Sequence, residues 1–258
     1  MHPILFHIGG ITIHTYGVFV ATGFALGLLL AVRSAKRAGV DPNKIIDLSV
    51  YILIAAIIGS RVLYVFVNWR DFRSNLFEAF YLWKGGLVFY GGFIGAASVA
   101  FWYMRRHALP VWKTVDILAP SIALGQSIGR IGCFSAGCCY GKPCDNWWRV
   151  TFSHPQTLAP IGVPLHPTQL YDSAGTFLIF LALIVLQKRK KIEGEVFCAY
   201  AIMYAGSRFI VEMFRGDDRG PVFLGGLSLS QMIAVFVAMA GVSMLFYLVS
   251  RKAPQQSK

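Results

Sequence analysis

The sequence predicts an all-α fold: a polytopic membrane protein with seven transmembrane helices and a long outer, periplasmic loop. The first observation is the composition, since 56% of the 258 residues are hydrophobic and 14% are charged, whereas soluble domains carry about 25% charged residues. The second is a set of seven apolar segments, and the third is an uneven distribution of basic residues. Residues 1–258 are therefore expected to form a single integral membrane domain.

Each of the seven apolar segments is long enough to cross ~30 Å of hydrocarbon as an α-helix. The fourth and sixth are the least apolar, so we expect them to face the interior of the helix bundle. The outer loop is expected over residues 131–168. The spans are expected near residues 15–33, 46–67, 86–104, 113–130, 169–187, 195–214 and 226–249.

Basic residues distinguish the two sides of the expected membrane domain. Fourteen of the 24 Lys and Arg residues fall on the side where the first segment ends, seven fall on the other side, and three lie within the spans. Because cytoplasmic loops carry the excess of Lys and Arg, we expect a periplasmic N-terminus and a cytoplasmic C-terminus. The net charge is +12, but basic residues at span ends indicate contact with the lipid bilayer rather than with nucleic acid.

The segment from Gly129 to Gly141 places an arginine where a span is expected to meet the outer loop. Arg130 stands there among four glycines. An arginine at membrane depth costs roughly 3 kcal/mol on insertion scales, so it indicates a functional site. The glycines allow the backbone to turn and a ligand to approach closely. We therefore expect this segment to bind the head group of an anionic lipid.

Two further arginines lie inside apolar segments. Arg61 is in the second segment and Arg208 is in the sixth, where Glu212 follows four residues later and Arg215 follows one turn further. Residues four apart share a helical face, so Arg208 and Glu212 could form an ion pair that holds helices together. Alternatively, three arginines near the outer ends of separate spans, with few acids beside them, would form a cationic pocket. Guanidinium groups grip phosphate through bidentate hydrogen bonds, so that pocket would accept a phospholipid.

A histidine and two tyrosines near span ends are further candidates. His166 precedes the fifth span, and a histidine can become charged near neutral pH and contact a phosphate. Tyr16 begins the first span, and Tyr90 is followed by the pair Gly91–Gly92, which leaves room beside the phenol. Polar and aromatic residues are also common at membrane interfaces without any further role, and that reading applies to all three.

Four of the five cysteines, Cys133, Cys138, Cys139 and Cys144, lie close together at the start of the expected outer loop. One or two disulfides can form on the outer side of a membrane. A metal or iron–sulfur site is less well supported, because no Cys-x-x-Cys spacing is present. A redox-active thiol pair is a further alternative. The sequence indicates no metal and no organic cofactor.

Six motifs in register resemble those of the prolipoprotein diacylglyceryl transferase (Lgt) family, and they extend over nearly the whole chain. Any one of them alone would be a weak signal, but their common order and spacing are specific. The motifs are Tyr16-Gly17, Gly59-Ser60-Arg61, Gly91-Gly92, Gly129-Arg130-Ile131-Gly132-x-Phe134-x-x-Gly137-x-x-x-Gly141, His166-Pro167-Thr168-Gln169-Leu170-Tyr171 and Tyr204-x-x-x-Arg208-Phe209-Ile210-Val211-Glu212-x-Phe214-Arg215.

This resemblance implies a bacterial inner-membrane enzyme that performs the first step of lipoprotein maturation. Such an enzyme moves the diacylglyceryl group of phosphatidylglycerol to the lipobox cysteine thiol of a prolipoprotein signal peptide, without a cofactor. The products would be a thioether and glycerol phosphate. By the same resemblance, the catalytic residues would be Arg130, Arg208 and Tyr90. The substrate-binding residues would be Arg130, Tyr16, Gly92, Cys133, Gly141, Arg61, His166, Tyr204, Glu212 and Arg215.

The chain departs from the family pattern at the positions nearest the thiol chemistry. Tyr90 stands where the family usually has a histidine, which is a proposed base, and tyrosine is a weak base at neutral pH. Cys133 and Cys138 replace a usual Asn and a usual Glu. Two alternatives follow: a diverged member that binds phosphatidylglycerol but uses another acceptor, and a thiol redox membrane protein that uses the cysteines from Cys133 to Cys144.

Overall fold

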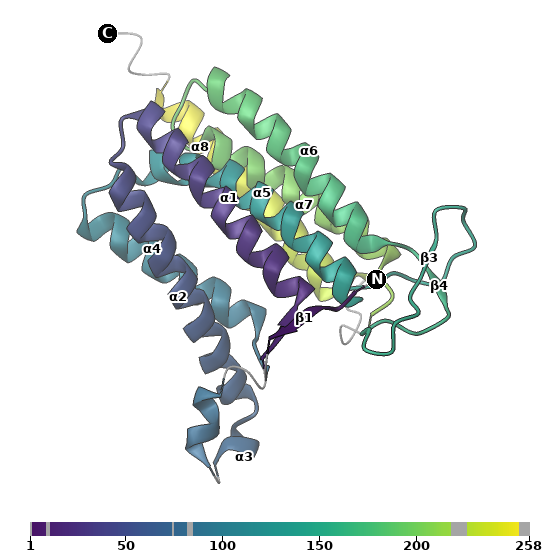
Figure 1. The fold of residues 1–258 in the computed structure, drawn as a ribbon. Helices are drawn as coiled ribbons and strands as arrows, with labels where there is room; N and C mark the ends of the chain where they lie inside the picture. Colours follow the sequence, from purple (N-terminus) through teal and green to yellow (C-terminus); the bar gives the residue numbers. More distant parts are fainter. Residues whose placement is uncertain (1, 9–10, 74, 82–84, 218–225, 253–258) are drawn as a thin grey trace. The chain divides into compact units, whose positions relative to one another are not determined.

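The structure is a computed structural model that describes residues 2–8, 11–73, 75–81, 85–217 and 226–252 (Figure 1). Nearly all of the regular structure is helical, as the sequence predicts. The elements in chain order are β1 (Ile4–Ile8), β2 (Ile11–His14), α1 (Thr15–Ala38), α2 (Pro42–Val67), α3 (Trp69–Phe72), the 3-10 helix η1 (Leu76–Phe80), α4 (Phe89–Arg106), α5 (Val111–Ala136), β3 (Val150–Thr151), β4 (Pro164–Leu165), α6 (Thr168–Arg189), α7 (Glu195–Phe214) and α8 (Leu229–Lys252).

Six of the described helices, α1, α2, α5, α6, α7 and α8, are long and apolar enough to cross a membrane. The prediction of an all-α polytopic membrane protein is confirmed at this level. Helix α4 corresponds to the third expected span, 86–104, but its 18 residues end in Arg105 and Arg106, and it is not among the six. The count of seven spans is therefore not confirmed.

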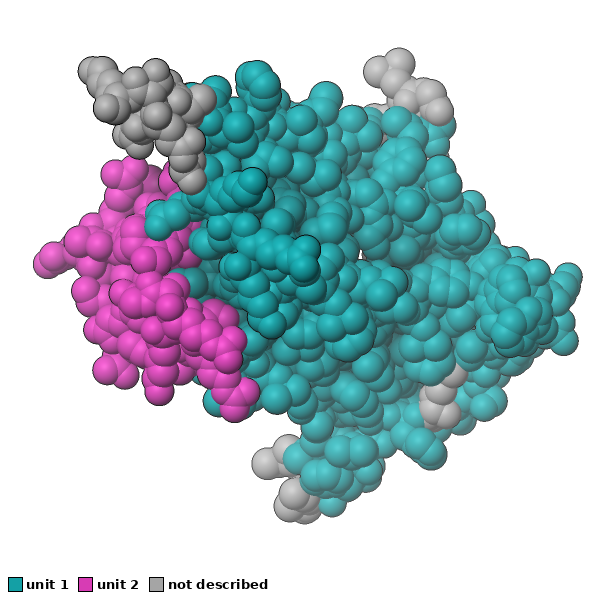
Figure 2. All heavy atoms as spheres, turned by 90° about the horizontal axis from the view of Figure 1, so that it is seen from above, with its two compact units in different colours: residues 1–31, 115–258 teal, residues 32–114 magenta. Residues whose placement is uncertain are grey.

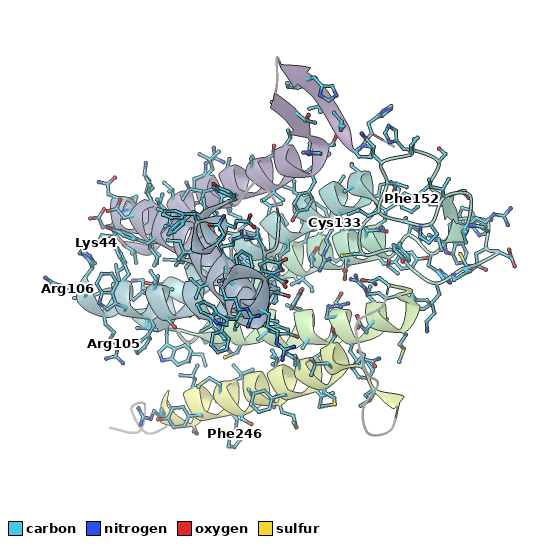
Figure 3. All side chains as sticks on the ribbon, turned by 90° about the horizontal axis from the view of Figure 1, so that it is seen from below. Lys44, Arg105, Arg106, Cys133, Phe152 and Phe246 are labelled. Atoms are coloured by element: carbon cyan, nitrogen blue, oxygen red, sulfur yellow. The ribbon has the colours of Figure 1, made fainter. Side chains whose placement is uncertain are left out.

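The chain divides into two compact units (Figure 2). Unit 1 comprises residues 1–31 and 115–258, and unit 2 comprises residues 32–114. In unit 2, α2 starts at Pro42 after the N-cap Asp41, whose side chain accepts a hydrogen bond from the Asn43 backbone N–H. A proline at the first helical position and an acidic cap are both favourable helix starts. Lys44, Arg105 and Arg106 lie at the same end of this unit (Figure 3).

Glycines bring α2 and α4 into direct backbone contact within unit 2. A Cβ atom on Gly59 would lie 2.4 Å from the carbonyl oxygen of Gly91, and a Cβ atom on Gly92 would lie 2.9 Å from that of Ala56. Small residues at this spacing let membrane helices approach closely and pack. The structure thus gives Gly92, predicted as a substrate-binding residue, a packing role between two helices.

Replacing Gly91 with Ala is expected to destabilise the protein by about 1–3 kcal/mol, since overpacking forces a backbone shift. The new Cβ atom would lie 2.3 Å from the Gly59 carbonyl oxygen. The control is Gly206→Ala in α7, where no atom lies within 4 Å of the added Cβ, so helix propensity should make that change neutral or stabilising. Thermal unfolding in detergent measures both, and equal unfolding midpoints would contradict the packing argument.

In unit 1, α1, α5, α6, α7 and α8 run side by side (Figure 1). Helices α5, α6 and α7 share a core of Ala119, Ala123, Ile179, Leu183 and Val196. The carboxylate of Asp116 in α5 fixes the start of α7. It accepts hydrogen bonds from the backbone N–H groups of Gly194 and Phe197, both at 2.9 Å, and from Lys190 Nζ at 2.7 Å. A carboxylate at a helix N-terminus satisfies N–H groups that have no partner within the helix.

Helix α5 ends at Ala136, six residues later than the expected end of the fourth span. Gly129 and Gly132 therefore lie inside a helix, and the expectation that they let the chain turn is wrong. The turn comes at Gly137, whose φ is +77°, a conformation that favours glycine. The helix continues because nothing in residues 131–136 breaks it, and Gly132 serves close packing instead.

The expected loop 131–168 is also more ordered than predicted. Beyond Ala136, strands β3 and β4 pair antiparallel, with Val150 opposite Leu165. Beneath them lies a small core of Phe152, Ala159 and Leu165, to which Phe134 from α5 adds its ring. Figure 3 shows Cys133 and Phe152 at the same end of unit 1. This apolar core anchors the segment 137–167 to the end of α5.

Candidate active site

The centre of the candidate site is a set of ionised side chains from α5, α6 and the end of α7. Asp172, in the first turn and a half of α6, is buried, and its Oδ2 atom lies 3.4 Å from Arg130 Nε and 4.0 Å from Arg215 Nη1. None of the sequence motifs includes Asp172. It could have been found, because a carboxylate one residue after Tyr171 inside an apolar span is itself a functional-site signal.

A second part of the same set lies on α7. Arg208 and Glu212 form the ion pair that their spacing predicts, and the Ser228 hydroxyl donates to Glu212 Oε1 at 3.0 Å. Arg215 lies 4.0 Å from Glu212 and donates two hydrogen bonds to Asp217, at 2.9 and 2.8 Å. Arg208 and Glu212 thus belong to one ion-pair network with Arg215 and Asp217.

The expectation that Arg130 and Arg208 have few acids beside them is wrong, and Arg61, the third arginine of the predicted pocket, belongs to unit 2. Among the described residues, the arginines Arg130, Arg208 and Arg215 face the carboxylates Asp172, Glu212 and Asp217, so the formal charges of this set cancel. Burying uncompensated charges would cost several kcal/mol per ion, and the carboxylates remove that cost. The arginine side chains differ in accessibility, with exposed fractions of 23% for Arg130, 10% for Arg208 and 2% for Arg215. Arg130 is therefore the arginine that a ligand reaches most easily.

Two tyrosines predicted for the site belong to unit 1 and lie near Arg130. Gly132 lets α5 approach α1 at Tyr16, because a Cβ atom there would lie 3.2 Å from the Tyr16 carbonyl oxygen. The Tyr16 phenol is half-exposed and interacts electrostatically with Arg130. Tyr204 stacks on Tyr200 with ring centroids 5.7 Å apart, and it too interacts with Arg130. The structure thus brings Tyr16 and Tyr204 to the arginine from α1 and α7.

His166 stands at the start of α6 in a polar and aromatic group. Its Nδ1 lies 3.1 Å from the Tyr171 hydroxyl, which accepts a hydrogen bond from Trp148 Nε1 at 2.7 Å. The Tyr171 proton is then available to His166 Nδ1 in the tautomer that leaves this nitrogen unprotonated. The His166 ring also packs against Phe214, with centroids 5.3 Å apart. These contacts hold His166 beside the end of α7.

Gly141 joins the segment 137–167 to the end of α7. Its N–H donates to the His166 carbonyl at 3.2 Å, and it forms a β-bridge with Arg215. A Cβ atom on Gly141 would lie 2.5 Å from the His166 carbonyl oxygen and 2.9 Å from that of Phe214. Gly141 therefore acts through close backbone packing that positions Arg215.

The remaining predicted residues, Arg61, Tyr90 and Gly92, belong to unit 2. Arg61 is buried, and its guanidinium donates to five backbone carbonyls, those of Glu78, Ala79, Tyr81, Gly85 and Gly86. A guanidinium has five N–H donors, so these carbonyls engage all of them and tie residues 78–81 and 85–86 to α2. Tyr90 lies at the start of α4, half-exposed, with its ring edge-on to Phe89.

The cysteines of the predicted cluster are free thiols in the structure. The sulfur atoms of Cys133, Cys138 and Cys139 lie within 4.8 Å of one another, and Cys144 is not part of this group. The pKa of the Cys139 thiol is lowered, because the thiols of Cys133 and Cys138 hydrogen-bond to it and Arg215 stands beside it. The pKa of Cys138 is raised by the same hydrogen bonds, to Cys133 and Cys139.

The apolar helices and the buried arginine–carboxylate network define a polytopic membrane protein with a polar site at one end of its helices. The sequence profile described as prolipoprotein diacylglyceryl transferase matches residues 3–247, and the chain belongs to this family. It is similar to phosphatidylglycerol–prolipoprotein diacylglyceryl transferases of Finegoldia magna, with 39% identity over 94% of each chain, and of Clostridium tetani, with 37% identity over 94% of this chain and 96% of the relative. A third, from Pediococcus pentosaceus, is 35% identical over 96% and 90%.

Proposed function

We infer that this protein transfers the diacylglyceryl group of phosphatidylglycerol to the lipobox cysteine thiol of a prolipoprotein, the first step of lipoprotein maturation. Its relatives carry this activity in their names, and they match the chain over nearly its full length. The observation that supports the activity in this chain is the pairing of Arg130 with Asp172 beside Arg215. It supplies a partly accessible guanidinium, held in place by a buried carboxylate, for a lipid phosphate.

The reaction is a substitution at the glycerol carbon that carries the phosphate ester. The acceptor sulfur forms a C–S bond to this carbon, the C–O bond breaks, and its electron pair leaves on the oxygen of glycerol phosphate. The thiol proton must also be removed, because the thiolate is the nucleophile. Positive groups aimed at the leaving phosphate stabilise the charge that develops there, and such fixed electrostatic interactions are often the largest catalytic contribution.

We assign the phosphate of phosphatidylglycerol to Arg130, since it is the most accessible of the three arginines. Arg208 lies on α7 and is oriented by Glu212, and it stabilises the departing glycerol phosphate. Asp172 is a positioning residue, because it touches both Arg130 and Arg215. Tyr16, Tyr204 and His166 line the site. Arg61 keeps its five carbonyl partners and holds residues 78–81 and 85–86 against α2. The rings of Phe77 and Phe80 on η1 are exposed.

For the membrane, we propose that α4 completes a set of seven spans in the bacterial inner membrane. The excess of basic residues then lies in the cytoplasm, the N-terminus and the segment 137–167 lie in the periplasm, and the C-terminus is cytoplasmic. Large apolar side chains on the helices face outward, such as Phe246 on α8, which is 76% exposed and points away from the bundle (Figure 3). Lipid tails would cover these side chains.

Replacing Tyr90 with Phe is expected to change the transfer rate by no more than a few fold. A phenol is a poor general base at neutral pH, so loss of the Tyr90 hydroxyl should leave the chemistry in place. The measurement is the initial rate of diacylglyceryl transfer to a lipobox peptide in detergent. A loss comparable to that of Arg130→Ala would show that the Tyr90 hydroxyl takes part in the proton transfer.

The activity is tested by expressing the chain in a bacterium depleted of its own transferase. The expected result is restored growth and a prolipoprotein whose lipobox peptide gains the mass of one diacylglyceryl group. The matched control is Arg130→Ala, expressed and inserted to the same level, which should leave the peptide mass unchanged. An unchanged mass with the wild-type chain would overturn the proposed transfer and favour the diverged member that uses another acceptor.

A further inference from the structure

Three cysteine sulfurs converge at the end of α5, and the mechanism above uses none of them. Cys133 comes from the last turn of the helix, and Cys138 and Cys139 come from the loop after it. Their sulfur atoms lie within 4.8 Å of one another. Sulfur ligands of one tetrahedral zinc ion lie ~3.8 Å apart, given a Zn–S distance of about 2.3 Å. The group thus needs a small contraction to enclose one ion.

Hydrogen bonds from α6 fix the backbone of Cys138 and Cys139. Thr168 Oγ1 donates to the Cys139 carbonyl, and Gln169 Nε2 donates to the Cys138 carbonyl, both at 2.8 Å. Both donors are fully buried in the first turn of α6. The Cys138 thiol in turn faces the Cys133 carbonyl at 3.7 Å. Supporting contacts of this kind orient metal ligands and keep a site preorganised.

The charges around the three sulfurs suit an anionic metal–thiolate group. Three thiolates and one divalent ion carry a net charge of −1. Arg215 lies beside Cys139, and Arg130 lies near Cys133, so two guanidinium groups of the arginine–carboxylate network are next to that charge. A disulfide would join two of the three sulfurs and leave the third unused, whereas a single soft cation uses all of them.

We propose that Cys133, Cys138 and Cys139 bind one divalent cation of the zinc class and leave a fourth coordination position open. Three protein ligands with an open position are the arrangement of catalytic zinc sites. The neighbouring arginines are the groups assigned to the lipid phosphate, so the open position lies beside the phospholipid. The acceptor that has to reach the phospholipid is a thiol, and a thiol is therefore the expected fourth ligand. Resting on the proposed transfer, the inference assigns the open position to the sulfur of the lipobox cysteine.

Metal coordination would provide a way to remove the proton of the acceptor thiol, for which the Tyr90 phenol is a poor base. A thiol that coordinates zinc is deprotonated outright, and its proton goes to water when it binds. The bound sulfur then forms the C–S bond as the C–O bond to glycerol phosphate breaks, with no change of oxidation state at any atom. Nucleophiles are commonly activated by metal coordination in this way. The chain has cysteines at positions 133 and 138 where the family usually has Asn and Glu. These cysteines would then accompany the change from the usual histidine to Tyr90.

Cadmium titration of the reduced, full-length protein in detergent tests the site itself. We expect one equivalent of Cd²⁺ to give ultraviolet thiolate-to-cadmium absorption. Replacing Cys133, Cys138 or Cys139 with Ser should lower the affinity at least about tenfold. The matched controls are C144S and C198S, whose sulfurs lie outside the group; they should bind as the wild type does. Absence of the absorption, or equal loss in the controls, would overturn the proposal.

Differential alkylation gives a second readout that does not depend on the variants folding. With the wild-type protein, Cd²⁺ should protect Cys133, Cys138 and Cys139 from maleimide labelling and leave Cys144 reactive, as read by peptide mass. In a parallel sample, free thiols are alkylated in intact cells, and the protein is then reduced and labelled again. A disulfide within the group would appear as cysteines that escape the first alkylation and react only after reduction. That result, or equal labelling with and without Cd²⁺, would count against a metal site.

The fourth position is tested separately with Co²⁺ in place of Cd²⁺. A lipobox peptide with cysteine should change the visible cobalt absorption, and the same peptide with serine should not. If Co²⁺ binds but both peptides leave the spectrum unchanged, the assignment of the acceptor thiol fails. Failure of the complementation test with intact Cd²⁺ binding would instead reject the transfer and keep the metal site, so the two failures are distinguishable.

Discussion

Replacing Arg130 with Ala is expected to lower kcat/KM for diacylglyceryl transfer by at least about 10²- to 10³-fold, the cost of removing one group that stabilises developing charge. Its guanidinium is partly accessible and is held by the buried carboxylate of Asp172 at 3.4 Å. Lysine should rescue only a small part of the loss, since an ammonium is a point charge without the planar fork that binds phosphate in a bidentate manner.

The control for Arg130 is Arg149→Ala in the segment 137–167. Arg149 is half-exposed and meets the exposed Asp145 at 3.9 Å, so its removal should change the rate by less than about twofold, as expected for a surface pair. The double variant R130Q/D172N separates folding from chemistry. It removes the buried charge of Asp172 together with the charge of Arg130. Its thermal stability should therefore exceed that of Arg130→Ala, while its transfer activity stays low. Full activity in Arg130→Ala would contradict the assigned role.

Replacing Asp116 with Ala is expected to reduce the free energy of unfolding by about 2–6 kcal/mol, because two backbone N–H groups would each lose their acceptor at a cost of about 1–3 kcal/mol. The Asp116 side chain has no exposed surface, and its oxygens accept from Lys190 and from the N–H groups of Gly194 and Phe197. All of these donors would lose their partner. Lys190 is partly exposed and can turn to water, so most of the cost arises at the two backbone N–H groups.

Asp145→Ala is the matched control for Asp116, because the Asp145 side chain is 98% exposed. It should change the stability by less than about 0.5 kcal/mol. Asp116→Asn should fall between the two, since it keeps one oxygen acceptor of similar size. Urea unfolding in mixed micelles measures all three. Similar losses for Asp116→Ala and Asp145→Ala would show that the start of α7 does not depend on the buried carboxylate.

A neutral arginine–carboxylate network has a consequence for lipid binding. In the proposed function, a lipid phosphate would have to compete for Arg130 with Asp172, which already lies 3.4 Å from its guanidinium. Asp172 keeps a second cationic neighbour in Arg215, at 4.0 Å, so the carboxylate remains compensated when Arg130 turns to the ligand.

Features that depend on local periodicity are predictable from the order of the residues. Apolar segments of spanning length gave α1, α2 and α5 to α8 close to their observed positions, because a helix in hydrocarbon must satisfy its own backbone and therefore needs a continuous apolar run. The pair Arg208–Glu212 was also predictable, because residues four apart meet on one helix face. The end of α5 was not, since the glycines of Gly129–Gly132 are compatible with either a helix or a turn.

The tertiary structure decided every feature that joins distant parts of the chain. The pairing of Arg130 with Asp172, the five carbonyls around Arg61 and the packing of Gly92 against Ala56 depend on how helices cross, which local patterns do not encode. The same holds for the three sulfurs of Cys133, Cys138 and Cys139. Their sequence has no Cys-x-x-Cys spacing. They meet because the chain turns at Gly137 after α5, and because Thr168 and Gln169 of α6 hydrogen-bond to the backbone of Cys139 and Cys138.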